Sequence, residues 1–460
     1  MLSKYKQPLS ITLFTFACLT TNLNAADLDS DGLLDLNEIE NFASYTDDAF
    51  VHFNNIGLED LDGANQLTAT DIRIFYNNID TVKTGTFVNM NTAYDVDLRY
   101  NNIRKVEANS FQNLPDINKI DLGYNEIEIL NANAFKGLTN LRDLRLGYNK
   151  FSTIAPGIFS DLDKLWHLDL VDTQLSTIAA NDFQNLTKLD NMRLNYNQIS
   201  HIDTHAFDNL SELTELLMRN NDLNTLQNGL FDGLSKVKHL DVGYNDLETL
   251  GKDVFQSFTQ IEELELGYNF LGNSFEDGTF RTLGTAWRID IRYNNITNLN
   301  MTDAALDSIE SFKVAGNPIE SANFTRASFT QNSFYHTLNG TTNLDTLRNI
   351  ILDEVDFENA TDLNELLIAN HVETLSIQNA TNLQLTNIDL VFDDQYMQNL
   401  HTLNLTGSWN DLTQPQQSNL LAWDDIEGNT LIIPEPTTAL LTLSLITFIT
   451  TPRRKRHAVA

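Results

Sequence analysis

Six residues close to the N-terminus carry oxygen atoms at spacings that can surround one cation. They are Asp27, Asp29, Asp31, Leu33, Asp35 and Glu38. The aspartates offer carboxylate oxygens, Leu33 offers its carbonyl, and Glu38 can offer both of its oxygens. Gly32 allows the sharp turn that directs these groups at one ion. The spacing predicts a calcium site, and the alternative is an acidic, solvated N-terminus.

The stretch 27–38 resembles the calcium loop of EF-hand proteins, because its acids, its glycine and the apolar Leu34 occupy the characteristic positions. The resemblance implies calcium as a cofactor. Residues 1–25 have the layout of a secretory signal peptide, with two lysines, an apolar run and small residues before the cleavage point. Cleavage after Ala25 or Ala26 would remove the entering helix, so the sequence predicts half of an EF-hand. Lipidation at Cys18 is the alternative to cleavage there.

A second set of candidate residues recurs along the chain at a step of 24 residues. Tyrosine stands directly before a recurring asparagine in eight repeats, and arginine occurs two or four residues before it in several. The candidate ligand-binding residues are Tyr76, Tyr100, Tyr124, Tyr148, Tyr196, Tyr244, Tyr268, Tyr293, Arg99, Arg145, Arg193, Arg219 and Arg292. Tyrosine and arginine are enriched in protein-recognition surfaces. The alternative is that the tyrosines stack on one another and stiffen neighbouring coils.

The same repeat predicts the elements that position these residues. Asparagine recurs at 77, 101, 125, 149, 197, 221, 245 and 269, with Thr173 in register. Aliphatic pairs spaced by two, such as Leu144 and Leu146, predict a strand whose apolar side chains point inward. A phenylalanine ten residues after each asparagine, from Phe87 to Phe255, predicts a buried aromatic column. The asparagine carboxamide should bridge backbone groups of neighbouring coils.

The pattern LxxLxLxxNxIxxIxxxxFxxLxx resembles the leucine-rich repeat family in its 24-residue extracellular-type version. The resemblance implies an α/β repeat solenoid, a horseshoe with a parallel sheet on its concave face and a small N-terminal cap, and it implies a binding scaffold. The predicted segments are a signal peptide (1–25), a loop and cap (26–67), regular repeats (68–317), degenerate repeats (318–412) and a helical C-terminal cap with a linker (413–432). In the degenerate part, the motif LxxLxL persists at 347–352, 372–377 and 400–405.

The C-terminal segment 433–460 has three parts in order. Pro434, Glu435 and Pro436 precede an apolar run, 439–449, and four basic residues follow at 453–456. Together they resemble the PEP-CTERM sorting signal of Gram-negative-type bacteria. The resemblance implies a transient transmembrane segment in the inner membrane, cleavage by an exosortase-like protease, and delivery to the cell surface or extracellular matrix. A retained membrane anchor is the alternative.

Composition bounds the function. The chain has 63 acidic and 29 basic residues, a net charge of −34, which disfavours nucleic-acid binding. Its single cysteine lies in the predicted signal peptide, so the mature protein is predicted to lack disulfides.

The sequence contains no motif typical of an enzyme. No nucleophile, phosphate-loop or HExxH motif is present, and His201 and His205 do not form one, so no catalytic residue is assigned and an enzyme is not expected. The sequence predicts a protein or peptide ligand on the concave face. The alternative is a structural or polysaccharide-associated matrix component stiffened by calcium.

Overall fold

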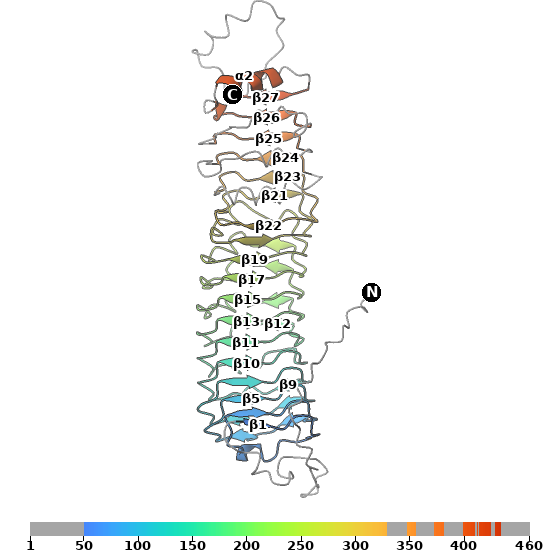
Figure 1. Ribbon diagram of the computed structural model, residues 1–460, viewed down its shortest axis with the longest axis vertical. Coiled ribbons are helices and arrows are strands. Elements are labelled where there is room, and N and C mark those ends of the chain that lie inside the picture. Colours follow the sequence, from blue (N-terminus) through green and yellow to red (C-terminus); the bar gives the residue numbers. More distant parts are fainter. Residues whose placement is uncertain are drawn as a thin grey trace, which may run out of the picture.

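The chain winds into coils that stack into one elongated column in the computed structural model (Figure 1). The structure describes residues 50–328, 347–355, 372–380, 399–409, 412, 414–424 and 428–433. The predicted calcium loop, Asp27–Glu38, and the predicted sorting segment from Pro434 onward lie outside these residues. Parallel strands stacked coil on coil confirm the predicted leucine-rich repeat solenoid.

One wall of the column is a 12-stranded parallel sheet. Its strands, in spatial order, are β1 (Phe50–His52), β2 (Asp71–Arg73), β5 (Asp95–Asp97), β8 (Lys119–Asp121), β10 (Asp143–Arg145), β11 (His167–Asp169), β13 (Asn191–Arg193), β15 (Glu215–Leu217), β17 (His239–Asp241), β19 (Glu263–Glu265), β20 (Arg288–Asp290) and β22 (Ser311–Lys313). The pairing is in register, so that Leu144 lies beside Leu168 and Leu168 beside Met192. These central residues are buried, while the residues on either side of them point outward. We call that outward surface the strand face.

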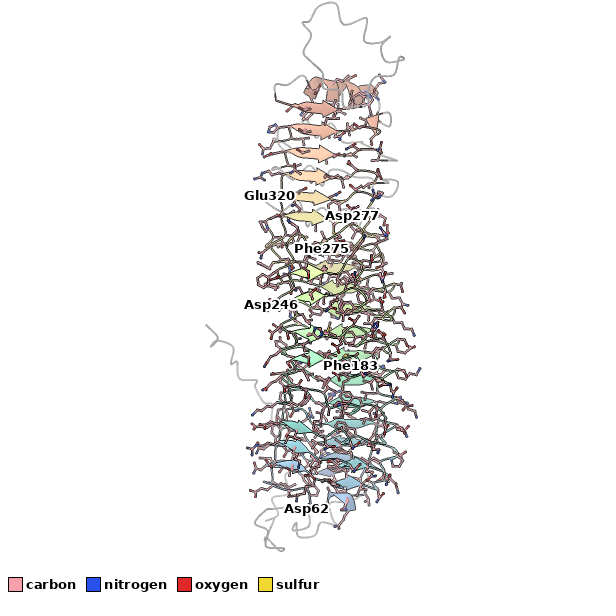
Figure 2. The ribbon with its side chains drawn as sticks, turned by 180° about the vertical axis from the view of Figure 1, so that it is seen from behind. Asp62, Phe183, Asp246, Phe275, Asp277 and Glu320 are labelled. Carbon is pink, nitrogen blue, oxygen red and sulfur yellow. The ribbon has the colours of Figure 1, made fainter. Side chains whose placement is uncertain are left out.

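The phenylalanine column is buried as predicted. Phe87, Phe111, Phe135, Phe159, Phe183, Phe207, Phe231, Phe255 and Phe280 are all at most 1% exposed. Ring centroids are 5.1 Å apart for Phe87 and Phe111 and 6.2 Å apart for Phe183 and Phe207. Figure 2, seen from behind, shows Phe183 within the column and Asp246 at its edge. No single coil could bury such a column alone, so the coils stabilise one another.

The asparagine side chains bridge neighbouring coils. Asn149 Nδ2 donates to the carbonyl of Leu122 in the preceding coil (3.0 Å) and to that of Leu146 in its own coil (2.8 Å). Its Oδ1 accepts from the N–H of Ile127 (2.9 Å). Each asparagine therefore pairs backbone groups that the turn after the strand would leave buried and unpaired. At the irregular position, the Thr173 hydroxyl donates to the Leu170 carbonyl (3.2 Å), and Asn197 Oδ1 lies 2.9 Å from its oxygen.

Shorter strands line the other walls of the regular coils. They form one three-stranded sheet and three two-stranded sheets, which are β3 (Thr81–Val82), β6 (Lys105–Val106) and β9 (Ile129–Leu130); β4 (Phe87–Val88) and β7 (Phe111–Gln112); β12 (Thr177–Ile178) and β14 (His201–Ile202); β16 (Thr225–Leu226) and β18 (Thr249–Leu250). A single 3₁₀ turn, η2 (Ala64–Gln66), precedes the first regular coil in the described region. The predicted N-terminal cap contributes a strand, because β1 pairs in register with β2.

A six-stranded sheet continues the column toward the C-terminus. Its order is β21 (Asn298–Asn300), β23 (Ser321–Asn323), β24 (Asn349–Ile351), β25 (Thr374–Ser376), β26 (Thr402–Asn404) and β27 (Thr430–Ile432). The three degenerate LxxLxL motifs form β24, β25 and β26. The first of them, β24, pairs with β23, which follows Asn317, and not with β22, which precedes it; β25 then pairs with β24 and β26 with β25. The degenerate repeats thus extend the six-stranded sheet that begins with β21 and β23, and not the 12-stranded sheet.

The column ends on helix α2 (Gln414–Asp424), which packs beside β27 (Figure 1). This is the helix predicted as a C-terminal cap. Leu420 and Trp423 are buried, whereas Leu421 is 41% exposed. In the described part of the chain, none of the helices has the length and apolar character that a membrane-crossing segment requires.

Candidate binding surface

The eight candidate tyrosines share a backbone conformation that the sequence pattern did not reveal. Each follows a strand of the 12-stranded sheet by three residues and has a left-handed φ between 52° and 61°. That region is unfavourable for a bulky residue and is tolerated best by glycine, asparagine and aspartate. Two coils without a tyrosine carry Asp172 (φ 53°) and Asn220 (φ 56°) at the equivalent position. The fold therefore imposes the conformation, and tyrosine accepts it at a local cost.

The tyrosine rings form two stacks. In the first, Tyr76, Tyr100, Tyr124 and Tyr148 have successive centroids 4.5, 4.5 and 4.2 Å apart. In the second, Tyr244, Tyr268 and Tyr293 are 4.1 and 4.6 Å apart. Tyr196 lies between the stacks, is 56% exposed and has no ring partner among the described residues. The rings both stack and remain accessible, so both interpretations of this column stay open.

The second stack is closed at both ends. At one end, Gly316 allows the Tyr293 ring to approach, since a Cβ there would lie 2.3 Å from the ring. At the other end, the Arg219 guanidinium carbon lies 4.2 Å from the centroid of Tyr244. The outer face of Tyr148, at the end of the first stack, has no such cover in the described structure.

Four of the five candidate arginines are held by aspartates of the strand face. Arg99, Arg145 and Arg292 each form a forked pair with an aspartate two residues earlier, and Arg219 lies 3.6 Å from Asp241 in the following coil. Arg193 is exposed and makes no ion pair with any residue that the structure describes. Most of these cations are therefore already neutralised within the surface.

Asp121 is the most strongly perturbed carboxylate of the strand face. It is 1% exposed, and burial raises its pKa to about 6. The Gly123 N–H donates to Oδ1 (3.1 Å) and opposes that rise. Oδ2 has no hydrogen-bond donor in the described structure, although Arg99, Lys119 and Arg145 lie 3.4, 3.8 and 4.0 Å away. Asp121 therefore titrates in the range where most exposed aspartates are already ionised.

The described residues near the N-terminus do not add a metal site. Lys83 Nζ lies 2.5 Å from Asp60 and 3.3 Å from Asp62, so a lysine occupies the space between these two carboxylates and offsets one of their two charges. Across the described ranges, no three His, Cys, Asp or Glu side chains converge as ligands for a metal ion. His201 and His205 are exposed and pair with Asp203 and Asp208.

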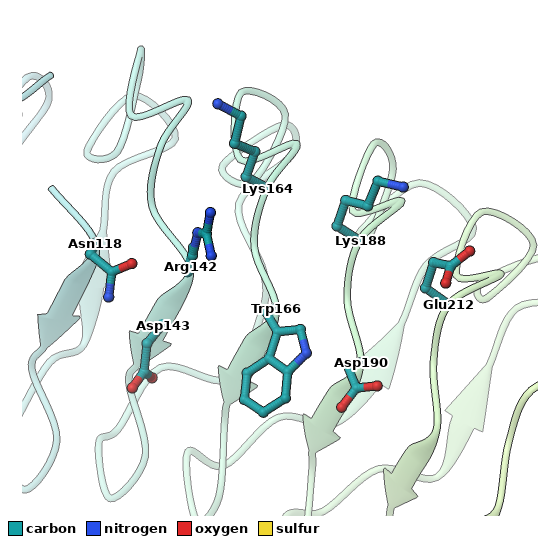
Figure 3. A pocket seen from close by; sticks show the side chains of 8 residues that line it. All are labelled: Asn118, Arg142, Asp143, Lys164, Trp166, Lys188, Asp190 and Glu212. Carbon is teal, nitrogen blue, oxygen red and sulfur yellow. The ribbon is translucent and has the colours of Figure 1, made fainter. Parts of the chain in front are cut away.

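A hollow of about 720 Å³ lies beside the strand face, around an exposed tryptophan. It is lined by Asn118, Arg142, Asp143, Lys164, Trp166, Lys188, Asp190 and Glu212. Figure 3 shows Trp166 between Asp143 and Asp190, with Lys164 and Lys188 on the loops that border the hollow. Trp166 is 55% exposed and also lines a smaller hollow of about 250 Å³ that reaches Arg193. An indole this exposed between charged groups is a typical anchor for a binding partner.

The charges in this Trp166 hollow are unequally satisfied. Asp143 accepts from Arg145, Asp190 from the Thr214 hydroxyl (3.0 Å), and Glu212 from Lys236 (2.7 Å). Arg142 and Lys188, in contrast, form no ion pair with any residue in the described ranges. The charge left available to a ligand at this point is positive, on a chain whose net charge is −34.

Comparison with known proteins agrees with this geometry. The family model described as leucine rich repeat matches residues 69–127, 92–151 and 116–175. The model described as BspA type leucine rich repeat region (6 copies) matches residues 152–282. Residues 69–282 are leucine-rich repeats. No match is found among curated proteins.

Solved structures similar to the chain include the following two. A crystal structure of a TLR13–ssRNA13 complex matches with a TM-score of 0.54 and 20% identity over 84% of this chain and 52% of that one. The structure of the Leptospira interrogans LRR protein LIC12759 matches with a TM-score of 0.45 and 17% identity over 85% of this chain and 96% of that one. The chain spans about half the length of the TLR13 chain. At 20% identity, the match to the TLR13 chain shows a shared fold and nothing about ligands.

Sequence reasoning missed the Trp166 hollow, although the leucine-rich repeats contain a signal for it. The repeat of β11 departs from the pattern twice, with Asp172 in place of tyrosine and Thr173 in place of asparagine. Trp166 directly precedes the same strand. Departures concentrated in one repeat of a regular array mark the position where something other than stacking determines the residues.

Proposed function

We propose that this leucine-rich repeat protein is an exported bacterial protein that binds a protein or peptide ligand on its strand face, centred on the repeat of β11. The observation that carries the proposal is the coincidence of the exposed Trp166, its hollow and the break in the tyrosine column within one repeat. Leucine-rich repeats typically serve as binding scaffolds rather than as enzymes.

The mixed chemistry of the surface favours a protein or peptide over a uniformly charged polymer. Trp166 is bordered by the unpaired cations Arg142 and Lys188 and by carboxylates that already have donors. Aromatic anchors among mixed charges are typical of protein-recognition surfaces. A partner that contributes an apolar side chain and a carboxylate would satisfy both features.

Export and surface display form the second part of the proposal. BspA-type leucine-rich repeats are typical of surface or extracellular bacterial proteins. The signal peptide pattern at 1–25 and the PEP-CTERM pattern at 433–460 are consistent with this location, with an exosortase-like protease as processing partner. Mass spectrometry of surface-located protein should then find no residue beyond about Pro436, and intact Ala460 would contradict processing.

Calcium binding by Asp27–Glu38 is a separate proposal. Four aspartates and a glutamate at EF-hand spacing should bind calcium with an affinity of about 10⁻⁵ to 10⁻³ M, which is typical of extracellular sites. Calorimetric titration should show the binding, and Glu38→Gln should remove most of it. Equal titrations for the two proteins would contradict the site.

The decisive experiment for ligand binding compares two tryptophans. Trp166 and Trp287 hold equivalent positions, since each directly precedes a strand of the 12-stranded sheet. The backbone N–H of Trp166 donates to the Arg142 carbonyl, and that of Trp287 to the Glu262 carbonyl, in each case just before the preceding strand. Peptides selected from a displayed random library on the full chain should lose binding at least about tenfold with Trp166→Ala. Trp287→Ala, which lies outside the hollow, should leave binding unchanged. Failure to select any peptide, or retention of glycans alone on an array, would overturn the proposal.

A stiff extracellular spacer, associated with polysaccharide, is the second candidate. The stacked rings of Tyr76–Tyr148 and Tyr244–Tyr293 favour it, since continuous stacking resists bending of the column. This role predicts that the tyrosines contribute to stability and that no ligand depends on Trp166.

A further inference from the structure

The two stacks of tyrosine rings are separated by Tyr196 and by two coils without a tyrosine. Tyr148, Asp172 and Tyr196 occupy equivalent positions in three successive coils, since β10, β11 and β13 pair in register. All three have left-handed φ values, of 59°, 53° and 58°. Their side chains therefore leave the backbone in nearly the same direction, and the aspartate leaves a place where a ring would otherwise stack.

The size of this slot follows from the spacing of the coils. Adjacent parallel strands lie about 4.8 Å apart, so the rings of Tyr148 and Tyr196 are separated by about twice that distance. Within the stacks, successive ring centroids are 4.1 to 4.6 Å apart. One flat group fits between two tyrosines at this separation. In the described structure, no aromatic ring or cation stacks on either ring on the face that borders the slot.

The equivalent gap at Asn220 shows which group such a slot accepts. There the chain supplies its own Arg219, whose guanidinium carbon lies 4.2 Å from the Tyr244 centroid and whose Nη1 lies 3.6 Å from Asp241. Gly243 makes room for it, since a Cβ on that residue would lie 3.2 Å from Arg219 Nη1. At the Asp172 gap, the residue before the aspartate is Val171, which is 8% exposed and has no planar group. This second slot also has a tyrosine on each side, although Asn195 stands where Gly243 does in the first, and it is not filled by an arginine of the chain.

We propose that the slot between Tyr148 and Tyr196 receives an arginine side chain of a basic segment in the partner protein or peptide. The guanidinium plane would stack on both rings, and the exposed Asp172 carboxylate at the base of the slot would pair with its N–H groups. The net charge of −34 attracts such a segment to the chain at long range. At the slot itself the attraction comes from Asp172, because Arg142 and Lys188 leave the neighbouring Trp166 hollow positive. The inference rests on the proposed function, because the slot belongs to the same repeat as Trp166.

The test uses defined peptides, so that it does not require the natural ligand. Fluorescent hexa-arginine and hexa-lysine peptides carry the same charge, but only arginine presents a planar group. Titration of the full chain at moderate salt should give binding about tenfold tighter for the arginine peptide. Asp172→Tyr, which fills the slot with an additional stacking ring without creating a cavity, should remove this preference while leaving the lysine peptide's weak binding nearly unchanged. Tyr196→Ala should also remove the preference.

A charge-matched variant separates the slot from the general acidity of the surface. Asp246→Asn removes one exposed carboxylate elsewhere on the column and should leave the arginine preference intact, whereas Asp172→Asn should weaken it. Equal affinities for the two peptides in the wild-type protein would overturn the proposal. So would a preference that survives Asp172→Tyr, or a phenylalanine-rich peptide that competes for the slot more strongly than arginine. Loss of binding with Trp166→Ala alone would bear on the proposed function and not on the slot.

Discussion

The 12-stranded and six-stranded sheets use the same local backbone but fill it with different side chains. In both, a left-handed residue follows a strand by three positions wherever the structure describes that residue, which it does for every strand except β27. In the 12-stranded sheet this residue is usually tyrosine. In the six-stranded sheet it is Asp303, Arg326, Glu354, Asn379 and Gly407 in turn. The fold therefore needs the conformation and does not need the aromatic ring, so the tyrosine column has another cause.

The residue after the left-handed position differs in the same way. In the 12-stranded sheet it is a buried asparagine in every coil except those with Ile56 and Thr173, whereas in the six-stranded sheet it is Ala304, Ala327, Val355, Ala380 and Ser408. Ser408 bridges neighbouring coils as the asparagines do, with fewer hydrogen bonds. Its hydroxyl donates to the Ile377 carbonyl (2.8 Å) and accepts from the Ala380 N–H (2.9 Å). The left-handed residues Asp303, Arg326 and Glu354 form a ladder of ion pairs where the other sheet has rings. Two chemistries thus hold one kind of coil together.

The largest difference between the sheets should appear when a bridging side chain is removed. Asn149→Ala leaves an N–H and two carbonyls without their partner, at a cost of about 3–5 kcal/mol of unfolding free energy. Ser408→Ala removes a smaller bridge and should cost about 1–2 kcal/mol. Urea unfolding of the two variants measures both values. A cost for Asn149→Ala no larger than that for Ser408→Ala would show that the asparagine column is not what distinguishes the sheets.

The regular coils could be predicted from the sequence because each recurring position holds one residue type, and each residue type has one structural role. Phenylalanine at a step of 24 can only be buried by stacking, and Asn149 can only be satisfied at a turn between coils. The second sheet could not be predicted in this way. The segments 309–314 and 319–324 both begin Ile-Glu-Ser and both end in an apolar residue. Only the three-dimensional register shows that the later LxxLxL motifs continue the second of them.

The candidate surface was only partly predictable. Tyrosine, arginine and their periodicity mark the strand face, but the left-handed conformation is a property of the backbone. Asp172 and Asn220 indicated the left-handed conformation in the sequence, since they interrupt the tyrosine column and are residue types that tolerate a positive φ. The Trp166 hollow depends on which neighbouring carboxylates already have donors, and this follows from side-chain geometry that no spacing encodes.

A second contrast between the sheets concerns buried charge, and pH should reveal it. Asp121 ends a strand of the 12-stranded sheet, and none of the strands β21, β23, β24, β25 or β26 ends in a carboxylate. Because burial raises the pKa of Asp121 to about 6, its protonated form is favoured in the folded state. Its contribution to stability is therefore complete below about pH 4, the ordinary range for aspartate, and is lost as the pH rises through about 6.

Asp121→Asn should flatten this part of the stability profile. Between pH 4 and pH 7, the wild-type protein should lose up to about 3 kcal/mol of unfolding free energy relative to the variant, from a shift of about 2 pKa units. Chemical unfolding of both proteins at several pH values gives the difference. Parallel profiles would mean that the neighbouring Arg99, Lys119 and Arg145 hold the carboxylate ionised at its ordinary pKa.

The smallest effect separates the two interpretations of the tyrosine column. Tyr124 stacks on both faces, at 4.5 and 4.2 Å, whereas Tyr196 has no ring partner in the described structure, and their φ values are 55° and 58°. Substitution by alanine keeps a Cβ in the left-handed region at both positions, so the difference between the two variants isolates the stacking. Tyr124→Ala should cost about 1–2 kcal/mol more unfolding free energy than Tyr196→Ala, since it loses two ring contacts. Tyr196→Ala should in turn weaken the binding of a selected peptide more than Tyr124→Ala does, because the Tyr196 ring is free to meet a ligand on the face that borders the Asp172 slot, whereas both faces of Tyr124 are covered by rings. Equal stabilities would remove the stacking contribution, and unchanged binding in both variants would leave the column as a purely structural ladder, the hydrophobic counterpart of the ion pairs in the six-stranded sheet.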